Sequence, residues 1–279
     1  MYDLNQLDEA IAAYRRALDL DPNHTLAHFN LGNALRNKGR LDEAIEEYRA
    51  AIGLKPDYAE VHCNLGLLLQ QQGKYAEGLA ELRQGHEDGC MQPGWRYPSA
   101  QWVKEAERDL ELERRLPEIL NSKAPPTNNS ERLALARMCL EHKKFCVTAV
   151  RFYEEAFADD PKQADVHRYN AACAAALAGV GKTKDDPPSA EATKAKLREQ
   201  ARTWLRADLA TYAKRLEGEN SRSANLVQQR LRHWMSDPDL FGLRDPDAVT
   251  KLPVAEQEAC QKLWTEVEAL LQKAREKSK

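Results

Sequence analysis

The most constraining feature of the sequence is a period of 34 residues that begins near Thr25 and continues to residue 92. Small residues, histidines, asparagines and a closing proline all recur at this spacing. The recurring pairs are His28 and His62, Asn30 and Asn64, Leu31 and Leu65, Gly32 and Gly66, Gly39 and Gly73, Ala44 and Gly78, Tyr48 and Leu82, and Pro22 and Pro56. A period of this length is typical of stacked helical hairpins, because one hairpin cannot bury its own apolar face. The sequence therefore predicts an all-α helical solenoid.

Each unit of the repeat contains the signals for two helices and the turn between them. Apolar residues at helical spacing predict a first helix over residues 26–37. Gly39 supplies a left-handed turn, Asp42 begins the second helix, and Pro56 ends it. Gly32 removes a side chain where the second helix comes close, and the facing small residues are expected to be Ala44 and Ala51.

These residues resemble the tetratricopeptide repeat (TPR) family. The resemblance implies a TPR-type right-handed helical solenoid whose concave face binds a peptide segment or a partner protein. It divides the array, residues 1–90, into a half repeat over 1–24 and full repeats over 25–58 and 59–92.

Two departures from the repeat pattern carry expectations of their own. The half repeat lacks a partner helix, which predicts that Leu4, Leu7, Ile11 and Leu18 are exposed. Such a patch indicates self-association, and a frayed chain end is the alternative. In the last repeat glycines replace alanines, which predicts a less regular second helix and an end of the array near residue 89.

The remainder of the chain is predicted to form a connector and a second helical module. Residues 91–129 contain a helix over 98–120 and a Pro- and Asn-rich linker over 121–129. Residues 130–279 keep part of the repeat spacing and are expected to form a divergent TPR-like module with a C-terminal capping helix. Its expected helices cover residues 130–142, 147–158, 164–178, 190–216, 224–235 and 254–273.

The second half of the chain carries a further resemblance. The segments PGWRYPSAQW, YNAACAAALAG, WLRADL and RHWMSDPDLFGLRDP occur in this order over residues 90–270. They resemble the region that follows TPR repeats in many planctomycete serine/threonine protein kinases. Neither the Gly-rich loop nor the HRD and DFG motifs of a kinase domain is found in this sequence. The resemblance implies the non-catalytic, regulatory or substrate-recruiting part of such a bacterial kinase.

Composition and charge narrow the possible partners. The net charge of −3 argues against a general nucleic-acid binder, which needs a basic face. The six cysteines show neither a CxxC pair nor a disulfide spacing, so core positions in a reducing compartment are expected. No signal peptide or membrane-spanning run is recognised, and a cytoplasmic protein without membrane contact is expected.

The candidate binding residues lie on the first helices of the repeats. Asn30 and Asn64 are one period apart, so stacking is expected to align them on the concave face. Amide side chains can both donate to and accept from a peptide backbone. This arrangement resembles the asparagine ladder in the repeats of O-linked N-acetylglucosamine transferase. Asn33, Arg36 and Asn37 extend the same predicted face, and Arg36 can pair with a carboxylate.

Two other patterns were weighed against simpler explanations. His28 and His62 can be seen as a metal pair, but packing at an aromatic position is favoured, since no third ligand accompanies them. The stretch ALAGVGKT, residues 176–183, matches a relaxed phosphate-loop pattern without the strand that such a loop follows. No catalytic arrangement, metal site or cofactor is predicted. The expected function is that of a non-catalytic interaction scaffold.

Overall fold

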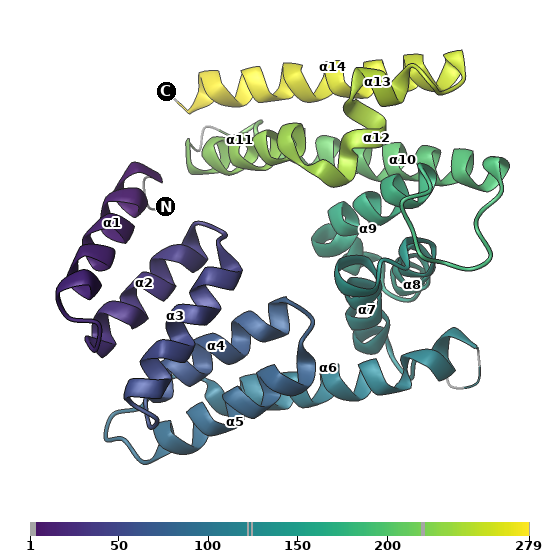
Figure 1. Ribbon diagram of the computed structural model, residues 1–279. Helices are drawn as coiled ribbons and strands as arrows, with labels where there is room; N and C mark the ends of the chain where they lie inside the picture. Colours follow the sequence, from purple (N-terminus) through teal and green to yellow (C-terminus); the bar gives the residue numbers. More distant parts are fainter. Residues whose placement is uncertain (1–3, 122, 124, 219–220, 279) are drawn as a thin grey trace. The chain divides into compact units, whose positions relative to one another are not determined.

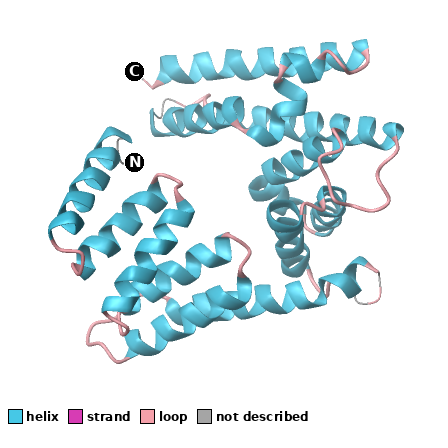
Figure 2. Ribbon diagram, viewed as in Figure 1, coloured by secondary structure: helices cyan, strands magenta, loops and turns pink. Residues whose placement is uncertain are grey.

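The structure is a computed structural model that describes residues 4–121, 123, 125–218 and 221–278. These residues form helices joined by turns, and no strand occurs in the described ranges (Figure 2). The expected all-α class is therefore confirmed. The chain divides into two compact units, Met1–Arg115 and Leu116–Lys279, which are described separately below (Figure 1). No described helix combines the length and the apolar character that a membrane crossing needs. The domain boundaries given above stay a prediction.

The first unit is an array of antiparallel helical hairpins (Figure 1). Its helices are α1 (Leu4–Leu20), α2 (Thr25–Asn37), α3 (Leu41–Leu54), α4 (Ala59–Gln71), α5 (Tyr75–Cys90) and α6 (Ser99–Leu120), which enters the second unit at Leu116. Gly39 and Gly73 have φ angles of 78° and 74°, so the predicted left-handed turns are confirmed. Helix α6 covers the last hairpin, where Ala106 packs with Leu79 and Leu82.

Helix α5 corrects the expectation of an irregular last helix. It runs without interruption from Tyr75 to Cys90, and its glycines lie against α4. A Cβ on Gly78 would lie 2.8 Å from the carbonyl oxygen of Gly66, and a Cβ on Gly85 would lie 2.8 Å from that of Ala59. These glycines cost about 1 kcal/mol each in helix propensity. They also bring two helix backbones into contact, and this close packing offsets the cost.

The close approach in the preceding hairpin also differs from the expectation. A Cβ on Gly32 would lie 2.6 Å from Cε1 of Tyr48, so the residue that faces Gly32 is Tyr48. The predicted facing residues, Ala44 and Ala51, are fully buried in the same core cluster. The ring of Tyr48 thus packs against the backbone of α2 at a position where only a glycine leaves room.

The expected exposed patch of the half repeat is wrong for the residues whose burial is described. Leu7 and Ile11 are 7% and 4% exposed, because α1 packs on α2 and the core of the first full repeat takes them in. Leu18 also packs against that core. The side chain of Leu4 lies outside the described residues. Self-association through this face therefore loses the apolar surface on which the prediction rested.

The second unit repeats the hairpin arrangement and then departs from it. Helix α7 packs on α8, α8 on α9, α9 on α10, and α11 on α14. The longer helices are α7 (Asn129–Met138), α8 (Cys146–Asp159), α9 (Ala164–Gly179), α10 (Glu191–Arg215), α11 (Ser221–Ser236) and α14 (Val254–Lys277). Short turns of helix connect them: a π turn (Cys139–Lys143), 3-10 turns (Pro161–Gln163 and Pro238–Leu240), α12 (Phe241–Arg244) and α13 (Pro246–Val249). Residues 171–178 of α9 are all buried, as their small side chains predict.

A buried ion cluster joins three helices of this unit. Arg198 on α10 donates to both carboxylate oxygens of Glu256 on α14, over 2.7 and 2.9 Å, and to the carbonyl oxygen of Gly179 on α9, over 2.6 Å. Arg202 approaches the same carboxylate at 3.5 Å. The hydrogen bond from Arg198 is the largest reason why the pKa of Glu256 is lowered. The last helix is thus tied to the rest of the unit by charge as well as by apolar packing.

Candidate peptide-binding face

The candidate binding residues lie on α2 and α4, the first helices of the two full repeats. Helix α2 begins after His24, whose ring nitrogen accepts a hydrogen bond from the backbone N–H of Ala27 at 3.3 Å. Helix α4 begins one repeat later, at Ala59. Because both helices bury most of their leucines and small residues in the core, the polar residues between them remain on a common surface, termed the α2–α4 face.

Three of the five predicted residues form one hydrogen-bonded cluster. The side-chain N–H of Asn64 donates to Oδ1 of Asn33 over 3.2 Å, and Arg36 donates to Oδ1 of Asn64 over 3.4 Å. All three side chains are half-buried. The cluster joins one repeat to the next, and amide and guanidinium groups within it keep further donors available for a ligand.

The other two predicted residues lie outside this cluster. Asn30 is half-buried and Asn37 is exposed, and in the described part of the chain neither side chain has a recorded hydrogen bond. Asn64 therefore pairs with Asn33, one helical turn beyond Asn30. The two asparagines at equivalent repeat positions do not bond to each other.

Tyr48 is a site residue that the sequence interpretation did not assign to binding. Its hydroxyl donates to Oδ1 of Asn33 over 2.8 Å, so the second helix α3 fixes the amide from behind. Burial raises the pKa of Tyr48 to about 12, and the hydroxyl stays a donor at physiological pH. The repeat pattern identified Tyr48 only as a position that recurs, as Leu82, in the next repeat. The second role of Tyr48 is to hold the Asn33 amide. The sequence signal for it is that this repeat position carries a tyrosine, which has a hydroxyl, where the next repeat carries a leucine.

A row of aromatic rings accompanies the cluster in the first unit and was also missed. The ring of Phe29 on α2 lies 5.4 Å from that of Tyr58 and 6.3 Å from that of Tyr48. In the α5–α6 loop, the ring of Tyr97 lies 4.7 Å from that of Trp95, and Tyr97 is 49% exposed. Aromatic side chains supply apolar contact area with a polar tip, which suits recognition of side chains in a ligand.

The two repeat histidines have a structural role in both repeats. His28 contacts the Glu47 carboxylate at 2.7 Å and the Pro22 carbonyl at 3.0 Å. His62 contacts Glu81 at 2.6 Å and the Pro56 carbonyl at 2.8 Å. Among the described residues there is no group of three ligands that can hold a metal ion. The histidines link the first helix to the second and to the preceding turn, a polar form of the packing role favoured above.

Nearby acceptors and negative charges explain why the pKa of His62 is raised. Both ring nitrogens of His62 face acceptors, so the doubly protonated ring satisfies both contacts. Burial lowers the pKa of His62, but the hydrogen bonds to Glu81 and Pro56, with the charges of Glu81 and Asp88, outweigh burial and leave the pKa raised.

The phosphate-loop-like stretch is used to cap a helix. It covers the end of α9 and the first residues of the loop to α10, and the described residues before it form no strand. Just beyond it, Asp185 accepts the backbone N–H groups of Val147 and Thr148 at 2.8 and 3.0 Å, and the Thr183 hydroxyl accepts that of Cys146 at 3.0 Å. These contacts satisfy the free N-terminal donors of α8. Thr183 and Asp185 are therefore used for hydrogen bonds within the chain.

Comparison with known proteins agrees with the hairpin geometry of the first unit. A family model described as TPR repeat matches residues 1–39 and again residues 32–73. No curated protein matches the chain.

Solved structures give weak overall similarity. The TPR protein YrrB, described as having an unusual peptide-binding site, is 19% identical over 69% of this chain and 89% of its own, with a TM-score of 0.33. The TPR domain of P58(IPK) is 13% identical over 97% and 88%, with a TM-score of 0.40. Yeast Tom70 is 13% identical over 95% and 59%, with a TM-score of 0.35. Similarity at this level transfers no function. The first part of this chain contains TPR repeats.

Proposed function

We propose that the protein is a non-catalytic interaction scaffold that binds an extended peptide segment of a partner protein on the α2–α4 face. The observation that carries this proposal is the hydrogen-bonded cluster of Asn33, Asn64 and Arg36, held from behind by the Tyr48 hydroxyl. A polar cluster fixed in this way loses little side-chain entropy when a ligand binds.

The unused hydrogen-bonding capacity of the cluster fits a peptide backbone. Oδ1 of Asn33 already accepts two hydrogen bonds, while its side-chain N–H groups have no recorded acceptor in the described ranges. They can donate to peptide carbonyls, and the Asn30 amide, one turn away, can both donate and accept. Arg36 keeps guanidinium donors for a carbonyl or a carboxylate of the ligand. A single arginine does not make the basic surface that nucleic acid requires, and a protein partner is favoured.

A pull-down from native lysate, read by mass spectrometry, tests the proposal. The full chain is compared with the triple variant Asn30→Ala/Arg36→Ala/Asn64→Ala and with Arg49→Ala. Arg49 is an exposed arginine of α3 that pairs with Glu77 at 3.3 Å and serves as the matched control. Circular dichroism must show equal helix content for all three proteins.

The proposal expects partners that the wild type and Arg49→Ala both retain and that the triple variant loses. Partners retained equally by all three proteins would reject the α2–α4 face as the binding surface. Synthetic peptides are then taken from the partners that the wild type binds and the triple variant loses. Fluorescence anisotropy measures the affinity of the protein for these peptides.

A second candidate function rests on the sequence segments of residues 90–270. Their resemblance to the region that follows TPR repeats in planctomycete kinases supports a regulatory or substrate-recruiting role beside a kinase domain. The discriminating observation is the coding sequence upstream of Met1. An in-frame kinase domain there supports this candidate, and an in-frame stop codon counts against it.

A further inference from the structure

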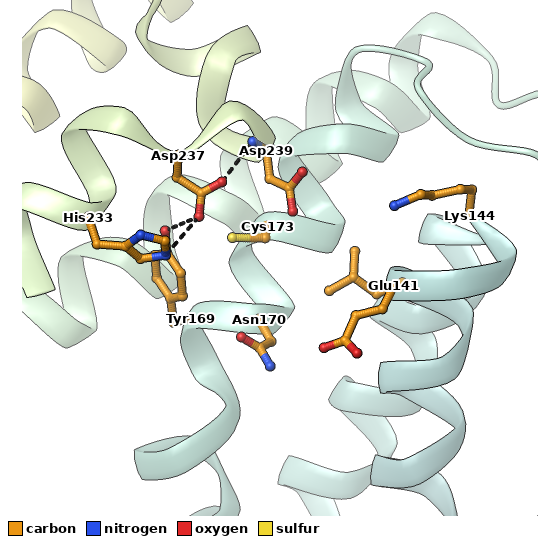
Figure 3. A pocket seen from close by; sticks show the side chains of 9 residues that line it. Glu141, Lys144, Tyr169, Asn170, Cys173, His233, Asp237 and Asp239 are labelled. Atoms are coloured by element: carbon orange, nitrogen blue, oxygen red, sulfur yellow. Dashed lines mark hydrogen bonds and ion pairs between the residues drawn. The ribbon is translucent and has the colours of Figure 1, made fainter. Parts of the chain in front are cut away.

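The second unit contains a pocket of about 280 Å³ to which the proposed binding face contributes no residue (Figure 3). Its walls come from the π turn after α7, from α9, and from the end of α11 with the following 3-10 turn. At about 30 Å³ per water, the pocket has room for roughly nine waters, which is the scale of one long side chain.

One wall of the pocket is fixed by internal hydrogen bonds. Asp237 accepts from the hydroxyl of Tyr169 at 2.5 Å and from the backbone N–H of Asp239 at 2.9 Å, and it lies 3.2 Å from Nε2 of His233 (Figure 3). The ring of Tyr169 is stacked on that of Trp234, with centroids 5.4 Å apart. Both carboxylate oxygens of Asp237 therefore already accept hydrogen bonds from within the unit.

Two further carboxylates, those of Asp239 and Glu141, face the pocket. Asp239 is half-buried, and its carboxylate has no recorded hydrogen bond or ion pair in the described ranges. Glu141 lies 3.7 Å from Nε2 of His142, and the charges of Arg137 and Lys144 act on its carboxylate. Lys144 is the only lysine or arginine of the lining, against three carboxylates. Burial raises the pKa of both Glu141 and Asp239, so a nearby positive charge would relieve both.

A buried tyrosine hydroxyl lies next to Asn170, a residue of the pocket lining. Tyr153 is 1% exposed, and its hydroxyl makes no hydrogen bond within the described part of the chain. Burial raises the pKa of Tyr153, and the charge of Glu141, which also lines the pocket, contributes to the rise. A buried hydroxyl without a close partner costs about 1–3 kcal/mol.

We propose that this pocket binds the guanidinium group of an arginine side chain from a partner protein, between the carboxylates of Asp239 and Glu141. A planar guanidinium carries five donors, which suits two carboxylates and the Asn170 amide that line the same pocket. The excess of carboxylates over the single Lys144 ammonium gives the complementary charge. The pocket volume fits one such side chain.

An NMR titration of the full chain with N-acetyl-arginine amide tests the proposal. N-acetyl-citrulline amide has nearly the same shape without the charge and is the ligand control. The pocket variants are Asp239→Asn and Glu141→Gln, which keep side-chain size. Asp247→Asn removes an exposed carboxylate on α13 that does not line the pocket, and it is the protein control.

The expected result is saturable shifts of the Asn170 and Asp239 amide signals with the arginine probe only. Each pocket variant is expected to weaken binding at least tenfold, and Asp247→Asn is expected to bind as the wild type does. Equal binding of the citrulline probe would overturn the proposal, as would unchanged affinity of both pocket variants or the absence of shifts at these amides. The triple variant of the α2–α4 face is expected to bind the probe normally, which separates this proposal from the proposed function.

Discussion

At the residue scale, two glycines in the same hairpin have opposite surroundings. Gly32 faces the Tyr48 ring so closely that an added Cβ would lie 2.6 Å from it, whereas Gly53 in α3 has no atom within 4 Å of such a Cβ. Gly32→Ala is expected to destabilise the first unit by about 1–3 kcal/mol through overpacking. Gly53→Ala is expected to stabilise it by about 0.5–1 kcal/mol through helix propensity. Urea unfolding measures both, and a loss of stability in Gly53→Ala or none in Gly32→Ala would contradict the packing described here.

The raised pKa of His62 makes a second residue-scale prediction. A histidine whose pKa is raised on folding contributes stability that is full below its unfolded pKa, near 6.5, and is lost as pH rises through the folded pKa. The urea midpoint of the first unit is therefore expected to fall as pH rises from 6 to 8.5. In His62→Gln this component of the slope disappears. Glu81→Gln keeps the ring but removes its carboxylate and is expected to show a weaker slope; unchanged slopes in both variants would refute the assignment.

At the element scale, the buried ion cluster predicts how strongly α14 is held. Glu256→Gln removes the carboxylate shared by Arg198 and Arg202, which are 2% and 6% exposed, and leaves Arg198 with only the exposed Glu191 at 3.0 Å among its described carboxylate partners. The expected loss is about 3 kcal/mol of unfolding free energy in the second unit, measured by urea denaturation at pH 7. Glu258→Gln, an exposed neighbour on α14, is the control and is expected to change little. A similar small change in both would show that the cluster contributes little.

The pH dependence of the same cluster has the opposite sign to that of His62. The pKa of Glu256 is lowered by its hydrogen bond with Arg198, so the stability it provides is present above the unfolded pKa, near 4.3, and is lost as pH falls through the folded pKa. Acid is therefore expected to release α14 in the wild type below about pH 4.

Helix existence and turn positions were predictable from the sequence because they depend on local signals. The period of 34 residues, Gly39 and Pro56 placed α2 and α3 within one or two residues of their bounds. Two predictions failed because they depended on a neighbour. Glycine propensity took no account of the α4 backbone against α5, and the exposure of Leu7 took no account of α2.

At the scale of the whole molecule, the two compact units have separate cores and are expected to unfold in separate transitions. Calorimetry of the full chain is expected to show two transitions. Gly32→Ala should lower one of them and Glu256→Gln the other. A single transition that both variants shift together would show that the units unfold as one.

The site residues were only partly predictable for a reason that also belongs to this scale. Repeat spacing identified Asn33, Asn64 and Arg36, because equivalent positions in stacked repeats share a surface. It did not show which amide pairs with which, since that depends on side-chain positions around Tyr48. The pocket of the second unit was not predicted at all. Asp239 lies 98 residues from Glu141 in the sequence, and no period connects them.

Each of the two full repeats satisfies its own histidine with groups of the same hairpin and of the turn just before it. In each repeat the histidine reaches only a glutamate of its own hairpin and the proline carbonyl just before it. An extra copy of residues 25–58, spliced in after Tyr58, would bring its own glutamate and its own closing proline. The chain can accordingly be lengthened by whole repeats at this junction without orphaning a repeat histidine, and engineered versions with a longer binding surface are a practical goal.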